Sequence, residues 1–381
     1  MNVTDSKQLG PWLALFHMSF PLKVSLGLIQ YFGSPSALLS ASDTELGSLG
    51  VSEKIRAAIR RYQEHPQSGK LYDLINASLL WAHEPNRHLI TLDDHRYPPR
   101  LKEITAPPLL LFVQGSPALL ATPQMAVVGS RHASPSGIET ANLFARQLAE
   151  RGLTITSGLA LGVDGASHQG ALMTGRPTIA VMATGADQVY PRRHFDLAQE
   201  ICQQGALITE FPLGTTPKPA YFPQRNRVIS GLSLGVLVVE AALRSGSLIT
   251  ARYAVEQGRE VFAMPGSIHN PTTKGCHEMI RQGAKLVETL DDILEELSPQ
   301  LLADVQSSGQ GSEVKESEAE ELCGMSRQVL DLVSHEVTSM DLLVERSGLP
   351  VVKLSQILMQ LELDNRVVNV AGGFIRKISR R

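Results

Sequence analysis

The stretch that decides the fold is MAVVGSRHASPSGIETANLFARQLAERG, residues 125–152, in which an apolar run precedes a small-residue loop and a helical pattern. The same succession recurs as far as about Leu297, with the further apolar runs LTITSG, TIAVMATG, ALITE, LGVLVVEA, EVFAMPG and AKLVE. Apolar runs that are continuous rather than alternating, each followed by a helix, indicate a parallel sheet covered on both faces. We therefore expect an α/β domain with an extended Rossmann-like parallel sheet over residues 86–300.

Smaller modules flank this domain. Residues 1–85 carry apolar residues at helical spacing in PWLALFHM, KVSLGLIQYF and EKIRAAIRRY, which predicts a small helical domain. Prolines before Leu109–Val113 block a helix, so this segment is expected to form an edge strand. Residues 301–320 lose the periodicity and are rich in Ser, Gly, Gln and Glu, as in a flexible linker. Residues 321–381 return to helical patterns and end in two short strands, which is the plan of a winged helix.

The composition restricts the ligand and the compartment. Because the formal net charge is −3, a site for a polyanion must be a local patch. The three cysteines, Cys202, Cys276 and Cys323, contain no C-x-x-C pair, so neither a disulfide framework nor a metal site is expected. The N-terminus lacks a signal-peptide pattern, and no stretch approaches about 18 apolar residues. We therefore expect a cytoplasmic protein without a membrane segment.

The first strand runs into VVGSRHASPSG and then into a helix, a place where free backbone N–H groups can hold an anion. Gly129 and Gly137 permit close backbone approach, Ser130 offers a hydroxyl, and Arg131 adds a guanidinium suited to phosphate. The loop is neither G-x-G-x-x-G nor G-x-x-x-x-G-K-[ST], so no dinucleotide cofactor and no nucleotide triphosphatase activity are expected.

Four further loops of small residues follow strand ends, and we expect all five to meet at one sheet edge as a groove for a polyanion. The second is SGLALGVD, the third GADQVYPRRH, the fourth SGSLITA and the fifth PGSIHNPTTKGCHEMI. The residues expected to bind in these four loops are Ser157, Gly158, Arg192, Arg193, Ser245, Gly246, Ser247, Thr250, Lys274 and Gly275.

The segment FPQRNRVISGLS, residues 222–233, is the densest in candidate ligand contacts. Arg225 and Arg227 flank Asn226 at an expected helix start, and Phe222 or Tyr221 is placed to stack on a base. Residues two apart on a helix do not face the same way. One of the two arginines is therefore expected to be structural and the other to meet the polyanion, and the sequence leaves open which.

Asp164, His168, Glu210 and Glu240 are the titratable groups nearest these loops. No nucleophile motif, H-E-x-x-H motif or carboxylate cluster at metal spacing accompanies them, so hydrogen bonding that supports the loops is favoured over acid–base catalysis. In the tail, acidic residues dilute the basic ones, and both duplex-DNA contact and protein interaction remain open.

Taken together and in order, six segments resemble the DNA-processing protein A family, also called DprA or Smf. They are VVGSRHASPSG, SGLALGVDGASH, GADQVYP, FPQRNRVISG, VVEAALRSGSLITA and VFAMPGSIHNPTTKGCHEMIRQGA. The family's G-S-R arginine falls on Arg131, its F-P-x-R-N-R motif on 222–227 and its S-G-[ST]-x-x-T-A motif on 245–251. The chain departs from the family's frequent Gly-x-Asn at Gly275, Cys276 and His277, which puts a side-chain role at that point in doubt.

The resemblance implies an extended Rossmann fold between a sterile-alpha-motif-like or helix-hairpin-helix-like domain and a winged helix. It implies single-stranded-DNA binding that protects incoming DNA, a homodimer through the Rossmann domain, help in loading a RecA-type recombinase during natural transformation, and no catalysis. The rival is a nucleotide phosphoribohydrolase-like enzyme of similar fold, but the comparable loop here reads S-G-S-L-I-T-A and lacks the P-G-G-x-G-T-x-x-E glutamate. A third interpretation is a protein-binding scaffold whose DNA binding is incidental.

Overall fold

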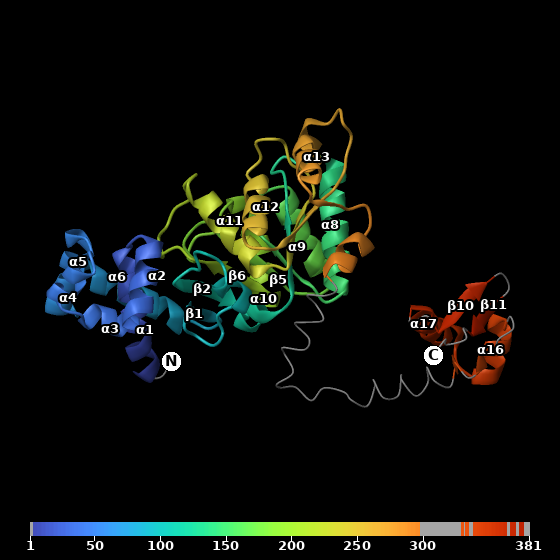
Figure 1. Ribbon diagram of the computed structural model, residues 1–381, viewed down its shortest axis with the longest axis horizontal. Helices are drawn as coiled ribbons and strands as arrows, with labels where there is room; N and C mark the ends of the chain where they lie inside the picture. Colours follow the sequence, from blue (N-terminus) through green and yellow to red (C-terminus); the bar gives the residue numbers. More distant parts are fainter. Residues whose placement is uncertain are drawn as a thin grey trace. The chain divides into compact units, whose positions relative to one another are not determined.

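In the computed structural model of the chain, the described residues are 3–297, 329–330, 332–334, 338–363, 366–370 and 373–376. The chain divides into two compact units, residues 1–306 and 307–381. Within the described part of the larger unit, a nine-stranded sheet carries helices on both faces, and a group of helices lies beside β1 and β2 (Figure 1). The expected α/β class with flanking helical modules is confirmed.

The sheet has the strand order β1-β2-β6-β5-β4-β3-β7-β8-β9. The strands from β3 to β9 pair parallel with one another, whereas β2 pairs antiparallel with both β1 and β6 at one end of the sheet. The bounds are β1 Arg87–Thr91, β2 Leu110–Gly115, β3 Gln124–Val128, β4 Thr154–Ser157, β5 Thr178–Val181, β6 Ala206–Thr209, β7 Gly235–Val238, β8 Glu260–Ala263 and β9 Lys285–Leu286.

The direction of strand succession reverses at β3. Strands β4, β5 and β6 continue on one side of β3, while β7, β8 and β9 continue on the other. The loops that follow β3 and β7 therefore run to opposite faces of the sheet and leave a crevice between them. Such a switch point is where open α/β sheets bind their ligands.

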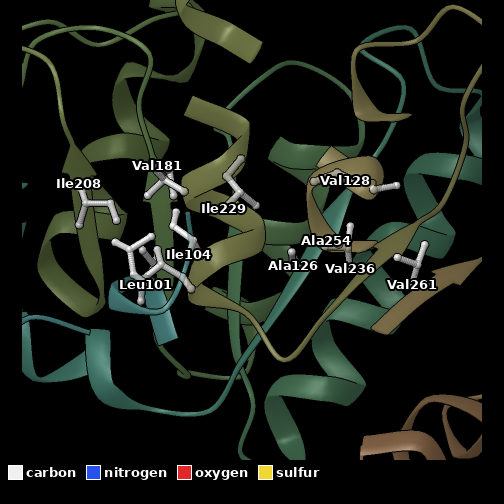
Figure 2. Close-up of a cluster of buried hydrophobic side chains, with 14 of the residues drawn as sticks. Leu101, Ile104, Ala126, Val128, Val181, Ile208, Ile229, Val236, Ala254 and Val261 are labelled. Carbon is white, nitrogen blue, oxygen red and sulfur yellow. The ribbon is translucent and has the colours of Figure 1, made fainter. Parts of the chain in front are cut away.

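Alternate side chains of each strand serve two separate cores, as parallel strands buried on both faces require. On one face Ala126, Val128, Val236 and Val238 pack under α7, α11, α12 and α13, and Figure 2 shows part of this cluster. The other face packs under α8, α9 and α10. The bounds are α7 Pro99–Lys102, α8 Pro135–Glu150, α9 Val163–Met173, α10 Phe195–Gln204, α11 Tyr221–Leu232, α12 Ser247–Glu256 and α13 Lys274–Arg281. Short 3-10 turns cover Pro117–Ala121, Arg192–His194 and Pro271–Thr273.

Helix α8 illustrates how the sequence forms these elements. Ser134 caps the helix by accepting a hydrogen bond from the Gly137 amide, and Pro135 takes the first turn, where its missing N–H is not needed. Ala141, Ala145 and Leu148 then recur at helical spacing and are fully buried against the sheet.

Six helices precede the sheet: α1 Val3–Met18, α2 Leu22–Phe32, α3 Pro35–Ser40, α4 Asp43–Ser48, α5 Glu53–Glu64 and α6 Gly69–His83. Their core contains Trp12 and Trp81 and extends onto Leu110 and Phe112 of β2. The rings of Trp81 and Phe112 meet edge to face with centroids 5.3 Å apart. The helices and the sheet thus belong to one compact unit, and a domain boundary at residue 85 remains a prediction.

The expected edge strand at Leu109–Val113 is a strand, but not at the edge. It forms β2 and lies between β1 and β6, with Phe112 and Val113 fully buried. The edge is β1, which the sequence did not predict because RHLIT, residues 87–91, is short and only partly apolar.

The smaller unit contains the described helices α16 Met340–Ser347 and α17 Val351–Leu363 and a hairpin of β10 Val367–Val370 with β11 Gly373–Arg376. Leu343, Leu354 and Leu358 are fully buried in its core. The helices and hairpin agree with the expected winged helix. The predicted linker at 301–320 lies outside the described residues.

Candidate nucleic-acid interface

A cavity of about 720 Å³ lies at the switch point between β3 and β7. It is lined by the end of β3, by the segment that follows β7, by the start of α11 and by the start of α12. The lining residues are Val128, Ser130, Arg131, His132, Ala160, Asp164, Tyr190, Pro217, Pro219, Phe222, Pro223, Arg225, Asn226, Ile229, Ala242, Arg244, Ser245, Gly246, Ser247, Ile249 and Thr250. We call this cavity the switch-point pocket.

The first turn of α12 supplies one wall of the switch-point pocket. Its first turn contains no acidic residue, and the amides of Leu248 and Ile249 donate to the Ser245 and Gly246 carbonyls at 3.2 and 3.1 Å. The Ser245 and Ser247 hydroxyls lie 2.6 Å apart, and Ser245 also accepts a hydrogen bond from the Ser247 amide. A helix amino end beside two hydroxyl groups is suited to an anion.

Arg225 of α11 forms part of the wall and is almost fully buried. Its Nη1 donates to the carbonyl oxygens of Gly158 and Val181, and its Nε donates to the Asn226 side chain at 3.2 Å. A Cβ at position 158 would overlap the guanidinium, so only glycine lets Arg225 approach the second loop.

Asp164 lies beside Arg225 and holds the second loop. Its Oδ2 accepts hydrogen bonds from the amides of Gly158 at 3.1 Å and Ala160 at 3.3 Å. Burial raises the pKa of Asp164, while the nearby Arg225 opposes that rise. Burial likewise lowers the pKa of Arg225 to about 10, which leaves it protonated at neutral pH. The expected loop-supporting role of Asp164 agrees with these contacts.

Arg131 and Phe222 meet across the mouth of the pocket. The guanidinium carbon of Arg131 lies 4.8 Å from the centroid of the Phe222 ring, within the range of a cation–π contact. The half-exposed Tyr190 ring lies 5.9 Å from Phe222 at a tilt of 59°. Tyr221 instead packs against Phe211, with ring centroids 4.6 Å apart, and does not line the pocket.

The amino end of α8 is not open to a ligand, contrary to our expectation for the first loop. The Glu240 carboxylate accepts hydrogen bonds from the Ser134 amide at 2.9 Å and from the Ser134 hydroxyl at 2.5 Å. A Cβ at position 137 would lie 2.6 Å from the Glu240 Cδ, and one at position 129 would lie 2.6 Å from Val163. The lack of a side chain at Gly137 therefore leaves room for the Glu240 carboxylate, and the lack of one at Gly129 leaves room for the Val163 side chain of α9.

Arg227 does not face the pocket. Its Nη2 forms an ion pair with Glu210, and both side chains are 9% exposed. Arg225 lines the pocket, but it is also bound to the Gly158 and Val181 carbonyls, so both arginines make structural contacts. Which of the two meets DNA stays a prediction, as does the supporting role of Glu210.

His168 is fully buried in α9, away from the pocket lining. The Thr178 hydroxyl donates to the Ile155 carbonyl, so it accepts from the His168 Nδ1 at 2.8 Å. Burial lowers the pKa of His168 to about 3. This arrangement fixes a neutral imidazole and fits the expected structural role. Ser157 is also buried, and its hydroxyl donates to the Val127 carbonyl at 2.6 Å.

The five loops do not all line the pocket. The first, second and fourth loops do, and the third contributes Tyr190. Arg192 and Arg193 are exposed beyond it. In the fifth loop Lys274 is exposed outside the lining, and the Gly275 amide donates to the Ala241 carbonyl at 2.7 Å. Gly275 thus serves packing between neighbouring loops.

Sequence reasoning missed Arg244 and His132, which are exposed and line the pocket. Arg244 stands immediately before the SGSLITA loop, so its position next to a small-residue loop was the signal that could have identified it. With Arg131 and Arg225 it gives the pocket three guanidinium groups against the single carboxylate of Asp164. A pocket with this charge balance attracts a polyanion.

Within the described ranges, no three His, Cys, Asp or Glu side chains are grouped so as to hold a metal ion. None of the helices described is both long and apolar enough to span a membrane.

Comparisons with known proteins give consistent matches. The sequence model of the DNA recombination-mediator protein A family matches residues 88–298, and that of the DprA winged helix domain matches residues 313–373. Protein Smf of Escherichia coli (strain K12) is 48% identical over 305 residues, which cover 79% of this chain and 80% of that protein. DNA processing protein DprA of Bacillus subtilis (strain 168) is 42% identical over 215 residues, covering 56% and 72%.

Two solved structures are also similar. DNA processing protein A from Streptococcus pneumoniae superposes with a TM-score of 0.66 at 34% identity, covering 78% of this chain and 99% of that one. DNA processing protein A from Helicobacter pylori, whose structure addresses a single-stranded DNA binding mode, superposes with a TM-score of 0.51 at 29% identity. It covers 57% of this chain and 98% of its own.

Proposed function

This chain belongs to the DNA recombination-mediator protein A family, also called DprA or Smf, and from that premise we propose that it binds single-stranded DNA in the switch-point pocket. The strand's phosphates contact Arg131, Arg244 and the amino end of α12, where Arg225 backs the pocket wall. The observation that carries the proposal is the convergence of three guanidinium groups and two serine hydroxyls at the start of α12 in one cavity.

The aromatic rings at the mouth of the pocket favour a single strand over a duplex. Phe222 and Tyr190 place two aromatic rings beside the guanidinium groups, and stacking on aromatic rings needs unpaired bases. A duplex keeps its bases stacked inside and offers only phosphates to such a pocket. Arg192 and Arg193, which are exposed and follow Tyr190 closely in the chain, offer two further positive charges to the strand.

Family membership supports a wider role for the chain. We propose that the protein protects incoming DNA in the cytoplasm, pairs as a homodimer through the sheet domain, and helps load a RecA-type recombinase during natural transformation. No catalytic step is included, because the carboxylates nearest the pocket, Asp164, Glu210 and Glu240, are each held in contacts that support the fold. Glu240 in particular is 6% exposed and bound to Ser134, which argues against the phosphoribohydrolase alternative.

A salt-dependent titration tests the proposal. The full-length chain should bind oligo-dT more tightly than a duplex of equal length, and log K should fall linearly with log salt because bound counterions are released. With about four phosphates neutralised, the slope should be roughly −3. Equal affinity for the single strand and the duplex, or a slope near zero, would contradict the proposed function. The same titration of residues 86–300 shows whether the sheet domain suffices.

A further inference from the structure

Two helices begin at the crevice beside β3 and β7, and they differ in what faces their amino ends. Helix α12 begins at Ser247, whose amide donates to the Ser245 hydroxyl, and its first turn contains no carboxylate and lines the switch-point pocket. Helix α8 begins at Pro135 and follows the glycine-containing loop that sequence reasoning assigned to phosphate. Both ends carry the partial positive charge of a helix dipole, so both are suited to an anion.

The Glu240 carboxylate occupies the α8 end. Its two oxygens accept from the Ser134 hydroxyl and amide, at 2.5 and 2.9 Å, and its backbone carbonyl accepts from the Ser130 amide at 2.7 Å. Glu240 follows β7 and reaches α8 only because β7 pairs with β3. The side chain is 6% exposed, so it is an enclosed part of the fold.

The glycine of the helix start makes this arrangement possible. A Cβ on Gly137 would lie 2.6 Å from the Glu240 Cδ and 2.8 Å from each carboxylate oxygen. Any larger residue would displace the carboxylate. The carboxylate therefore lies directly against the first turn of α8, where a phosphate oxygen would have to lie.

We propose that Glu240 is a specificity-determining residue: it acts as a built-in anion that excludes phosphate groups from the amino end of α8 and leaves α12 as the end that receives them. Two anions cannot share one helix end, because the second would meet the charge of the first in a buried setting. The exclusion applies to any phosphate group, free or nucleotide-borne. Only its consequence for the DNA strand rests on the function proposed above.

The variant Glu240→Ala tests this proposal, because it leaves a polar space that an inorganic phosphate can fill. Thermal unfolding of the full-length wild type and variant is compared in about 20 mM phosphate and in chloride of equal ionic strength and pH. The variant should unfold at a lower temperature than wild type in chloride. Phosphate should raise its Tm by about 2–3 °C more than that of wild type if the ion binds with a Kd near about 2 mM.

Gly137→Ala is the matched control. Its added methyl group displaces the carboxylate and fills the same space, so the Tm should fall in chloride but gain no more from phosphate than wild type does. The proposal is overturned if phosphate shifts Glu240→Ala and wild type equally. It is also overturned if Glu240→Ala cannot be refolded in phosphate, because the ion would then not replace the carboxylate. No DNA is present, so neither result bears on strand binding in the switch-point pocket.

Discussion

Replacing Glu210 with alanine is expected to lower the free energy of unfolding by about 3–5 kcal/mol, because Arg227 would remain buried without its counterion. The two side chains form an ion pair and are each 9% exposed, so water cannot readily replace the lost carboxylate. Gln257 donates to the Arg227 backbone carbonyl at 3.1 Å and helps keep this part of α11 in place. Urea denaturation followed by circular dichroism measures the loss.

A double replacement provides the control. In Glu210→Leu with Arg227→Met, both charges are removed and the volume is filled by apolar atoms, which is often nearly neutral for a buried ion pair. The double variant should recover most of the stability and should bind oligo-dT as wild type does, since Arg227 is not part of the pocket lining. A loss below about 1 kcal/mol for Glu210→Ala would show that the pair does not hold α11. If the folded double variant bound DNA more weakly than wild type, Arg227 would be part of the binding surface after all.

Replacing both Arg131 and Arg244 with alanine should weaken oligo-dT binding by roughly 10²–10⁴-fold at low salt, since each charge-assisted hydrogen bond to phosphate contributes about 1.5–3 kcal/mol. Two fewer neutralised phosphates should also reduce the magnitude of the salt slope by about 1.4. Both side chains are exposed, so the free energy of unfolding should change little. Fluorescence anisotropy across a salt series measures both quantities.

Arg176→Ala is the matched control for charge. Arg176 is exposed and precedes β5, so it lies at the end of the strands opposite the switch-point pocket. Its loss changes the net charge by one unit without altering the pocket, and the affinity should stay within about twofold. If Arg176→Ala weakened binding as much as Arg131→Ala or Arg244→Ala, net charge rather than the pocket would control affinity.

The sheet could be predicted from sequence because its signal is local. Each strand from β3 onward is a short continuous apolar run followed by a helical pattern, as in MAVVG before the α8 segment. The helix starts were also readable, since Ser134 and Pro135 are a cap and a first-turn proline. Strand β1 could not be predicted from the sequence, because its five residues are of mixed polarity and acquire their strand conformation from pairing with β2.

The binding surface could be predicted only in part, because its details depend on contacts between distant residues. Ser134 and Glu240 are 106 positions apart, and nothing in either segment shows that the carboxylate fills the start of α8. The sequence likewise does not show that Arg227 of α11 pairs with Glu210, which lies 17 positions earlier at the end of β6. The loops could be recognised from their small residues. The group that lies at each helix end could not be predicted without knowing which strands are neighbours in the sheet.

The route of the strand can be observed directly by photo-crosslinking the full-length chain to an oligo-dT that carries 4-thiothymidine. We expect crosslinked peptides that contain Phe222 or Tyr190, whose rings lie at the mouth of the switch-point pocket beside Arg131. Arg131→Ala with Arg244→Ala should lose those crosslinks. Crosslinks confined to helices α1–α6 or to residues 338–376, with none at Phe222 or Tyr190, would contradict the claim that this pocket receives single-stranded DNA.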